Sequence, residues 1–237
     1  MCGRYTITRE EMKLVTRFAE KFVRLCFVPR YNIAPTQKSP VVIVENGRIE
    51  QREMKWGFQP SWAKNPIINA QSETLNEKPT FKTAFQSRRC LVPADSFYEW
   101  KTIGQVKQPI RIMPANGEPF FMAGLWYREI KPVSSEPTFF DNEPDEIPKN
   151  QIEETFLILT GGANDFMRPI HHRMPFIVSP NHYDWWLDDS PANELYKSVI
   201  QFPSTEKLVG HPVRLRVNNA RHDDPACITP SAVNVLD

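Results

Sequence analysis

The chain begins MCGRY, so a cysteine directly follows the first methionine. If Met1 is removed, Cys2 carries a free α-amine and a thiol on adjacent carbon atoms. Both groups titrate at about pH 8 in unperturbed peptides, so each is partly nucleophilic at neutral pH. An aldehyde is the natural target of this pair, because the amine forms an imine and the thiol then closes a five-membered thiazolidine ring. Many second residues have no function, so Cys2 alone leaves both interpretations open.

A carboxyl group lies between aromatic residues in the stretch SFYEW. If this stretch is a strand, alternation places Phe97 and Glu99 on one face and Tyr98 and Trp100 on the other. Burial beside an aromatic ring raises the pKa of a carboxyl group and makes it a credible general acid or base near neutral pH. An exposed strand glutamate without a chemical role is the alternative.

The stretch PIHHRMP offers a histidine for proton transfer and an arginine for an anion. Neighbouring residues point in different directions, and no third ligand follows His171 and His172 at helical spacing, so we expect no metal site. Proton transfer by one histidine, with anion binding by Arg173, is the favoured interpretation.

An amide and two loops complete the candidate chemistry. Asn69 follows an apolar run in IINAQSET, where a buried amide would need fixed partners, although it could equally be a turn residue. The loops RYNIAPTQ and PSWAK carry Pro35, Thr36 and Trp62, which could stack on bases or wedge beside them. A tryptophan that covers the core is the common alternative.

The distribution of charge and the absence of two motifs limit the functions that the chain could have. The 237 residues have a formal net charge of +1, but six acidic residues face only Lys149 between Asp141 and Glu154. The remainder is therefore moderately basic and could bind phosphates, although solvated charge explains such a balance as well. Neither a GxSxG motif nor a phosphate-binding loop occurs.

The start of the chain lacks the pattern of a secretory signal, and nowhere do eighteen apolar residues run together. We therefore expect a cytoplasmic protein without a membrane partner. The four cysteines lack CxxC spacing, which argues against a disulfide framework or a zinc site. Cys26 and Cys90 have apolar neighbours and are expected to be buried and inert.

Local patterns predict the elements that must position these residues. Thr8 and Glu11 form a capping-box pattern before apolar residues at helical spacing, which predicts a helix from about Arg9 to Arg24. Two β-prone runs over residues 40–54 flank Asn46 and Gly47, which predicts a hairpin. Ser-Pro pairs at 179–180 and 190–191 predict two later helices.

Seven further β-prone runs follow the hairpin: RRCLVPA, SFYEWK, QPIRIM, PFFMAGLWY, TFLILTGGA, MPFIVS and HPVRLRV. Residues 131–154, rich in proline and acid, are expected to form one surface loop. These elements predict a single α+β domain over residues 1–237. Its core would be a curled, barrel-like mixed or antiparallel sheet with a few flanking helices.

The motifs MCGRY, RYNIAP, WGF with a following tryptophan, INAQSET, FYEW and HHRMP occur in this order along the chain, and the resemblance that they carry runs from Cys2 to at least Val217. Together they resemble the SRAP family, the SOS-response-associated peptidases or abasic-site processing proteins. The resemblance implies a compact α+β domain that binds single-stranded DNA and captures abasic sites covalently, without a metal or organic cofactor.

The resemblance also assigns roles to residues. It implies catalytic roles for Cys2, Asn69, Glu99 and His171. It implies DNA contacts by Arg4, Pro35, Thr36, Trp62, Arg173 and the position held by Gln71. Two departures occur: the family usually has arginine where this chain has Gln71, and glycine where it has Ser96. The loss of one cation is expected to weaken DNA binding rather than abolish the chemistry.

The resulting hypothesis is a sensor of abasic sites in single-stranded DNA that protects the lesion through a thiazolidine crosslink to Cys2. The hypothesis extends to an associated lyase activity and a self-processing peptidase activity, and the sequence leaves open whether the protein itself or an aminopeptidase removes Met1. We expect a monomer, cytoplasmic and associated with the nucleoid when bound to DNA. Two alternatives remain: a cysteine peptidase or N-terminal nucleophile hydrolase that uses the same residues, and a single-stranded DNA-binding protein without catalysis.

Overall fold

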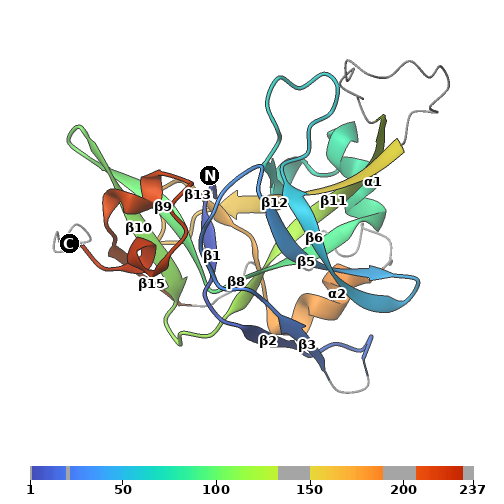
Figure 1. The fold of residues 1–237 in the computed structure, drawn as a ribbon, viewed down its shortest axis with the longest axis horizontal. Helices are drawn as coiled ribbons and strands as arrows, with labels where there is room; N and C mark the ends of the chain where they lie inside the picture. The colour runs from blue at the N-terminus through green and yellow to red at the C-terminus, as the bar shows by residue number, and fades with distance from the viewer. Residues whose placement is uncertain (1, 20–21, 133–149, 189–206, 232–237) are drawn as a thin grey trace, which may run out of the picture.

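The computed structural model describes residues 2–19, 22–132, 150–188 and 207–231. Within these ranges the chain forms mainly strands (Figure 1). The strands are β1 (Tyr5–Ile7), β2 (Glu11–Leu14), β3 (Val23–Cys26), β4 (Arg30–Ile33), β5 (Lys38–Glu45), β6 (Arg48–Trp56), β7 (Asn69–Gln71), β8 (Arg89–Ala94), β9 (Ser96–Ile103), β10 (Val106–Pro114), β11 (Phe120–Pro132), β12 (Asn150–Gly162), β13 (Arg173–Pro175), β14 (Ile177–Val178) and β15 (Leu208–Pro212). The helices are α1 (Pro79–Ser87), α2 (Tyr183–Leu187) and the short 3-10 helices Ser72–Thr74, Pro180–His182, Leu215–Asn218 and Pro225–Ile228.

Five strands pair in a closed circuit. Strand β12 pairs with β6, β6 with β5, β5 with β8, β8 with β11, and β11 again with β12. The β12–β6 pair is parallel and the other four are antiparallel. Closure leaves few free sheet edges, which suits a strand-rich domain. The prediction of an α+β fold with a barrel-like mixed sheet is confirmed.

A second sheet lies beside this barrel, with strand order β15-β10-β9-β1-β4. Its Tyr5, Phe97 and Ile112 belong to the same buried cluster as Trp56 and Phe156 of the barrel. The sheet and the barrel therefore share one hydrophobic core. The opposite faces of the barrel strands pack against α1, α2 and the hairpin β2–β3 in a second cluster.

The predicted hairpin over residues 40–54 is confirmed as β5 and β6, which pair from Lys38↔Lys55 to Glu45↔Arg48. Asn46 and Gly47 adopt φ angles of 53° and 72°, as the left-handed turn requires. The Ser-Pro pair at 179–180 does begin a helical segment, the 3-10 helix Pro180–His182 followed by α2. The second pair, at 190–191, lies outside the described residues.

The predicted helix from Arg9 to Arg24 is wrong, because this segment forms the hairpin β2–β3. Met12 and Leu14 are buried while Glu11 and Lys13 are exposed, which is strand alternation. Thr8 donates its hydroxyl to Asp95 Oδ2 at 2.6 Å and its backbone N–H to the same carboxylate. Since Asp95 binds Thr8, the capping pattern serves a tertiary contact rather than a helix start.

Several smaller differences concern element ends. The expected loop 131–154 is shorter, because β11 continues to Pro132 and β12 begins at Asn150. The run HPVRLRV is a strand only to Pro212 and then enters the 3-10 helix Leu215–Asn218. Helix α1 was not predicted, since KPTFKTAFQS lacks a capping pattern. Cys90 is buried as expected, but Cys26 is exposed at the end of β3, which corrects that expectation.

Among the described residues, no helix has the length and apolar character needed to cross a membrane.

Candidate active site

Cys2 is fully buried at the start of the chain, in the core shared by the sheet and the barrel. Burial raises the pKa of its thiol far above the ordinary value, and the nearby Glu99 carboxylate raises it further. The thiol is therefore held in its neutral form at physiological pH. A neutral thiol is a poor nucleophile on its own, so the site needs a proton acceptor beside it.

Asn69 connects Cys2 to the barrel. Strand β7 pairs in parallel with β12, with Asn69 opposite Ile158. From there Asn69 Nδ2 donates a hydrogen bond of 2.9 Å to the backbone carbonyl of Cys2. Asn69 Oδ1 is buried and accepts no hydrogen bond from the described residues. The buried amide thus has the fixed partner that the sequence required, and it keeps an acceptor close to the start of the chain.

Glu99 lies on β9 opposite Ile110 of β10 and is only 3% exposed. It shares a strand face with the fully buried Phe97, so burial among apolar side chains is confirmed. Its electrostatic effect on Cys2 shows that the two groups lie close together. Glu99 also lines a cavity of about 410 Å³, which brings the carboxyl group to the edge of the core.

His171 lines the same cavity from the segment between β12 and β13. His171 Nδ1 lies 2.9 Å from the backbone nitrogen of Arg173 and 3.1 Å from its carbonyl oxygen, so it accepts from the first when unprotonated and can donate to the second when protonated. The ring also stacks on His172, with 4.4 Å between centroids. His172 is exposed whereas His171 is half-buried. Of the two histidines, the structure therefore brings His171 to Glu99.

Arg4 and Arg173, the two expected phosphate contacts, bind groups of the protein itself. Arg4 Nη1 donates to Asn32 Oδ1 at 2.7 Å and to the Val217 carbonyl at 2.6 Å. Partial burial lowers the pKa of Arg4, but the group remains a cation at neutral pH. Both guanidinium groups therefore form hydrogen bonds to other residues of the protein.

Arg173 forms a two-pronged ion pair with Glu73. Its Nη1 lies 2.7 Å from Glu73 Oε1 and its Nη2 lies 2.9 Å from Oε2. Nη2 also donates to the carbonyl of Thr160. The guanidinium group holds the pKa of Glu73 below its ordinary value. A phosphate could bind Arg173 only in competition with this carboxylate or beside it.

The loop residues expected to meet DNA are accessible. Thr36 is exposed between β4 and β5 and has a φ of 73°, an uncommon value for a threonine. Its neighbour Pro35 is half-buried. Trp62 is 68% exposed on the turn between β6 and β7, so it does not cover the core. Gln71 is exposed at the end of β7, two residues after Asn69.

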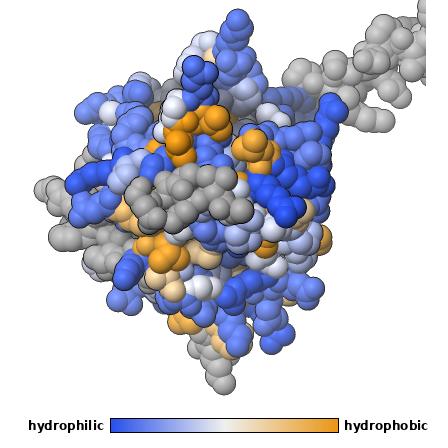
Figure 2. Space-filling model, turned by 90° about the vertical axis from the view of Figure 1, so that its left-hand side faces the viewer, coloured by the Kyte–Doolittle hydropathy of each residue, from blue (hydrophilic) through white to orange (hydrophobic). Residues whose placement is uncertain are grey.

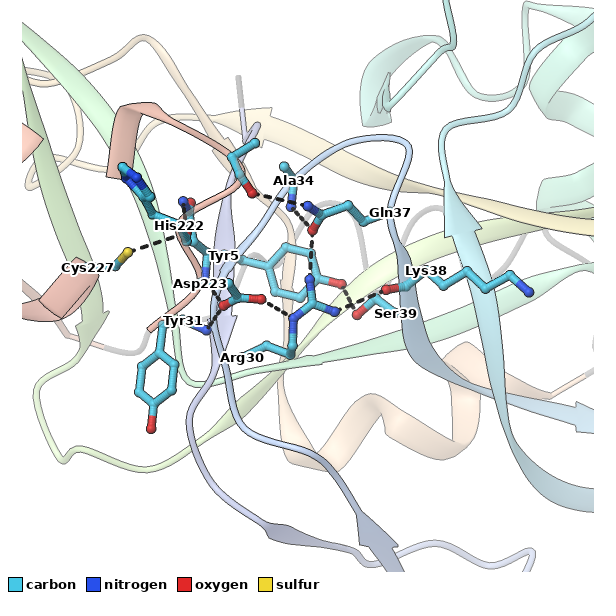
Figure 3. A network of polar contacts seen from close by, with 12 residues as sticks. Tyr5, Arg30, Tyr31, Ala34, Gln37, Lys38, Ser39, His222, Asp223 and Cys227 are labelled. Carbon is cyan, nitrogen blue, oxygen red and sulfur yellow. Dashed lines mark hydrogen bonds and ion pairs between the residues drawn. The ribbon is translucent and has the colours of Figure 1, made fainter. Parts of the chain in front are cut away.

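The segment 215–224 binds β4, and Figure 3 shows its Asp223 beside Arg30 and Tyr31 of that strand. Asp223 Oδ1 accepts the backbone N–H groups of Tyr31 and Asn32 at 2.5 and 2.9 Å, and Asp223 Oδ2 pairs with Arg30. The Asn32 amide donates to three backbone carbonyls of the segment, those of Val217, Asn219 and His222. Through Asn32 the segment also reaches Arg4, two residues from Cys2.

The cavity has three lining residues to which sequence reasoning gave no role: Trp100, Lys107 and Asn218. Trp100 follows Glu99 in FYEW, so alternation placed it on the other face and away from the site. Lys107 and Asn218 belong to no recognised motif. Only the hairpin pairing of β9 with β10, and the return of the chain at Leu215–Asn218, bring them to Glu99.

Ser96, which departs from the family pattern, has defined partners. Its hydroxyl lies 2.5 Å from Thr6 Oγ1 on β1 and accepts a hydrogen bond of 2.8 Å from Arg111 Nε on β10. Thr6 in turn donates to Asp95. Ser96 therefore connects the three central strands of the five-stranded sheet through polar groups, a role that glycine could not fill.

The fold and the site define an α+β protein with a buried second-residue cysteine beside an asparagine and a glutamate. The family model described as SOS response associated peptidase (SRAP) matches residues 1–220. The chain belongs to this family.

Named relatives agree with this assignment. The chain is 31% identical to the abasic site processing protein YoqW of Bacillus subtilis, covering 96% of this chain and 99% of the relative. It is 30% identical to the abasic site processing protein YedK of Escherichia coli, covering 97% and 100%. The protein HMCES of Gallus gallus, also named an abasic site processing protein, is 29% identical, with 87% and 68% covered.

Solved structures show the same fold. A protein from Bacteroides thetaiotaomicron has a TM-score of 0.66 at 24% identity, with 84% of each chain covered. A phage-related protein from Bordetella bronchiseptica has a TM-score of 0.65 at 26% identity, with 90% of this chain and 94% of that chain covered.

Proposed function

We propose that this protein processes abasic sites in single-stranded DNA by forming a thiazolidine crosslink through Cys2 after removal of Met1. The observation that carries the proposal is the setting of Cys2: Asn69 binds its carbonyl, and Glu99 lies close enough to raise the pKa of its thiol. The substrate class comes from the relatives, which are named abasic site processing proteins. The crosslink would protect the lesion during a DNA damage response.

Ring opening is the first step. An abasic deoxyribose is mostly a closed hemiacetal, so the C1′–O4′ bond must break before an amine can attack. Protonated His171 gives the proton on Nε2 to O4′ as this bond breaks. Nε2 of the resulting neutral ring then takes the proton of the C1′ hydroxyl, which leaves an aldehyde. In the protonated ring Nδ1 can donate to the Arg173 carbonyl, 3.1 Å away. General acid catalysis of this kind contributes roughly 10² to 10⁴ in rate.

Capture of the aldehyde follows. The Cys2 amine adds to C1′ and water leaves, which gives an imine. The thiol sulfur then bonds to C1′, and its proton passes to the imine nitrogen through Glu99. One C–N and one C–S bond form for each water released, and no metal or organic cofactor takes part. Because burial keeps the thiol neutral until this step, Glu99 is the group that accepts its proton.

The DNA strand would lie across the exposed loops and the two arginines. Trp62, Thr36 and Pro35 offer an aromatic ring and a stiff turn beside the lesion. Arg4, Arg173 and the neutral Gln71 would lie along the phosphates. We propose that the protein acts as a monomer in the cytoplasm and associates with the nucleoid when bound to DNA.

Two side activities are also proposed. The imine allows β-elimination at the lesion, so a slow lyase activity would accompany crosslinking. The family description suggests a peptidase, and the same residues could remove Met1. The buried thiol argues for slow peptide cleavage, since a cysteine peptidase needs a thiolate. Mass spectrometry of protein made without methionine aminopeptidase tests this activity: an intact Met1 contradicts it.

The crosslink is tested with single-stranded DNA that carries one abasic site. Processed wild-type protein should give a shifted band that survives denaturation, and Cys2→Ala should give none. Cys26→Ala is the matched control, because Cys26 is exposed on the β2–β3 hairpin. A band that persists in Cys2→Ala would contradict the proposal. Glu99→Gln should slow the reaction by about 10² to 10⁴ in a folded protein.

A further inference from the structure

The cavity that Glu99 and His171 line is also lined by Trp100, Lys107 and Asn218. These residues come from β9, from β10 and from the 3-10 helix Leu215–Asn218. These elements lie on the side of the molecule that faces the viewer in Figure 2, where the surface is mostly hydrophilic with separate hydrophobic areas. Four of the five residues that line the cavity are polar or charged: Glu99, Lys107, His171 and Asn218.

Asn218 is oriented by its neighbours. The indole N–H of Trp100 donates to Asn218 Oδ1 at 2.8 Å. Because an indole N–H can only donate, this bond fixes the amide with its NH₂ group on the other end. The preceding carbonyl, that of Val217, accepts from both Arg4 and Asn32, so the backbone of this wall is anchored. The cavity thus has a hydrogen-bond donor held in a fixed position.

Lys107 supplies a cation in the same cavity. It is exposed on β10 opposite Thr102 and forms no ion pair with any residue that the structure describes. The other cations expected at the site differ: Arg4 binds Asn32, and Arg173 binds Glu73. Of these three groups, Lys107 is the one whose charge is not already matched to a protein acceptor in the described part of the chain.

An ammonium group and an oriented amide NH₂ that line one cavity fit a phosphodiester, whose two free oxygens accept hydrogen bonds. We infer that Lys107 and Asn218 together bind the phosphate next to the abasic sugar. This inference rests on the proposed function for its ligand. The family usually has an arginine at the position of Gln71. Lys107 would replace that phosphate contact from a different strand.

The test uses a stable tetrahydrofuran analogue of the abasic site, which has no aldehyde and cannot crosslink. Binding to this DNA is measured by fluorescence anisotropy over a range of salt concentrations. Lys107→Ala should weaken binding about three- to tenfold and reduce the salt slope by about 0.7, the value for one phosphate on a single strand. Lys82→Ala is the matched control, because Lys82 is an exposed lysine on α1. Equal affinity and slope for the two variants would overturn the inference.

A second measurement identifies the phosphate. A neutral methylphosphonate placed next to the lesion should weaken binding by the wild type but not by Lys107→Ala, which has already lost that contact. Equal losses in both proteins would contradict the assignment. Asn218→Ala should also weaken binding but leave the salt slope unchanged, because the amide carries no charge, and thermal unfolding shows whether the variant has kept its fold. Since no crosslink is involved, these results are independent of whether the thiazolidine forms.

Discussion

The side chain of Asn69 on β7 donates a hydrogen bond of 2.9 Å to the backbone carbonyl of Cys2. This contact joins the first described residue to a strand that pairs with the barrel, and Cys2 itself is fully buried. The position of the proposed nucleophile is therefore determined by the barrel and not by the flexibility of a chain end.

Loss of the Asn69 amide should remove the hydrogen bond that holds Cys2 against the barrel. Asn69→Ala leaves the Cys2 carbonyl without this donor, which should cost about 1–3 kcal/mol in the free energy of unfolding. The crosslinking rate should fall about 100-fold, because the amine loses its fixed direction of attack. Urea denaturation and single-turnover gels measure the two effects. Asn181→Ala, an exposed asparagine beside α2, should change neither quantity.

The ion pair between Arg173 and Glu73 predicts a gain of binding. Glu73→Gln removes a negative charge that competes with phosphate for the guanidinium group. Affinity for single-stranded DNA should therefore rise about threefold, with a steeper dependence on salt. Anisotropy titrations measure both. Glu77→Gln, an exposed glutamate just beyond the 3-10 helix Ser72–Thr74, controls for the general change in charge. The same gain in both variants would show that Arg173 plays no special part.

The same pair predicts a dependence of stability on pH. Arg173 lowers the pKa of Glu73 from its ordinary value of 4.5. A lowered pKa stabilises the folded state above the unfolded-state value, and this contribution is lost as pH falls below about 4.5. The difference in melting temperature between wild type and Glu73→Gln should thus be small but constant near neutrality and vanish in acid. Glu73 is half-exposed, so solvent screens the effect.

Burial predicts the order in which the thiols react. Cys26 is exposed, whereas burial raises the pKa of the Cys2 and Cys90 thiols. At pH 7.5, iodoacetamide should label Cys26 more than about tenfold faster than Cys2 or Cys90, because the thiolate is the reacting form. Peptide mass spectrometry over time follows each site. Fast labelling of Cys2 in folded protein would contradict the buried setting.

The contacts of Asp223 predict that the substitution Asp223→Asn lowers the free energy of unfolding. Asp223→Asn keeps one oxygen for the N–H groups of Tyr31 and Asn32 but loses the ion pair with Arg30. These groups are partly buried, so the free energy of unfolding should fall by about 1–2 kcal/mol. Asp165→Asn breaks the exposed pair with Arg168 and should cost less than about 0.5 kcal/mol. Parallel urea denaturation compares the two.

The patterns that predicted structure well were those with a local physical cause. Asn46 and Gly47 tolerate left-handed backbone angles, so the β5–β6 hairpin followed from two residues. The capping pattern at Thr8 and Glu11 failed because a distant carboxylate, Asp95, binds Thr8. No local pattern reports a partner that lies 87 residues away.

Some residues of the candidate site could be predicted from sequence motifs, and others could be identified only from the folded structure. Cys2, Asn69, Glu99 and His171 lie in recognisable motifs, and the structure places Cys2 with Asn69 and Glu99, and Glu99 with His171. Lys107 and Asn218 lie in no motif, so only the folded chain brings them to the cavity. Likewise, the sequence indicated cations at Arg4 and Arg173 without indicating that protein groups already bind them.

The binding of β4 and Arg4 by residues 215–224 has a consequence during synthesis. The backbone carbonyls that accept from the Arg4 and Asn32 side chains lie 185 to 213 residues further along the chain. The ribosome must therefore release nearly the whole polypeptide before this end of the molecule can take its final form.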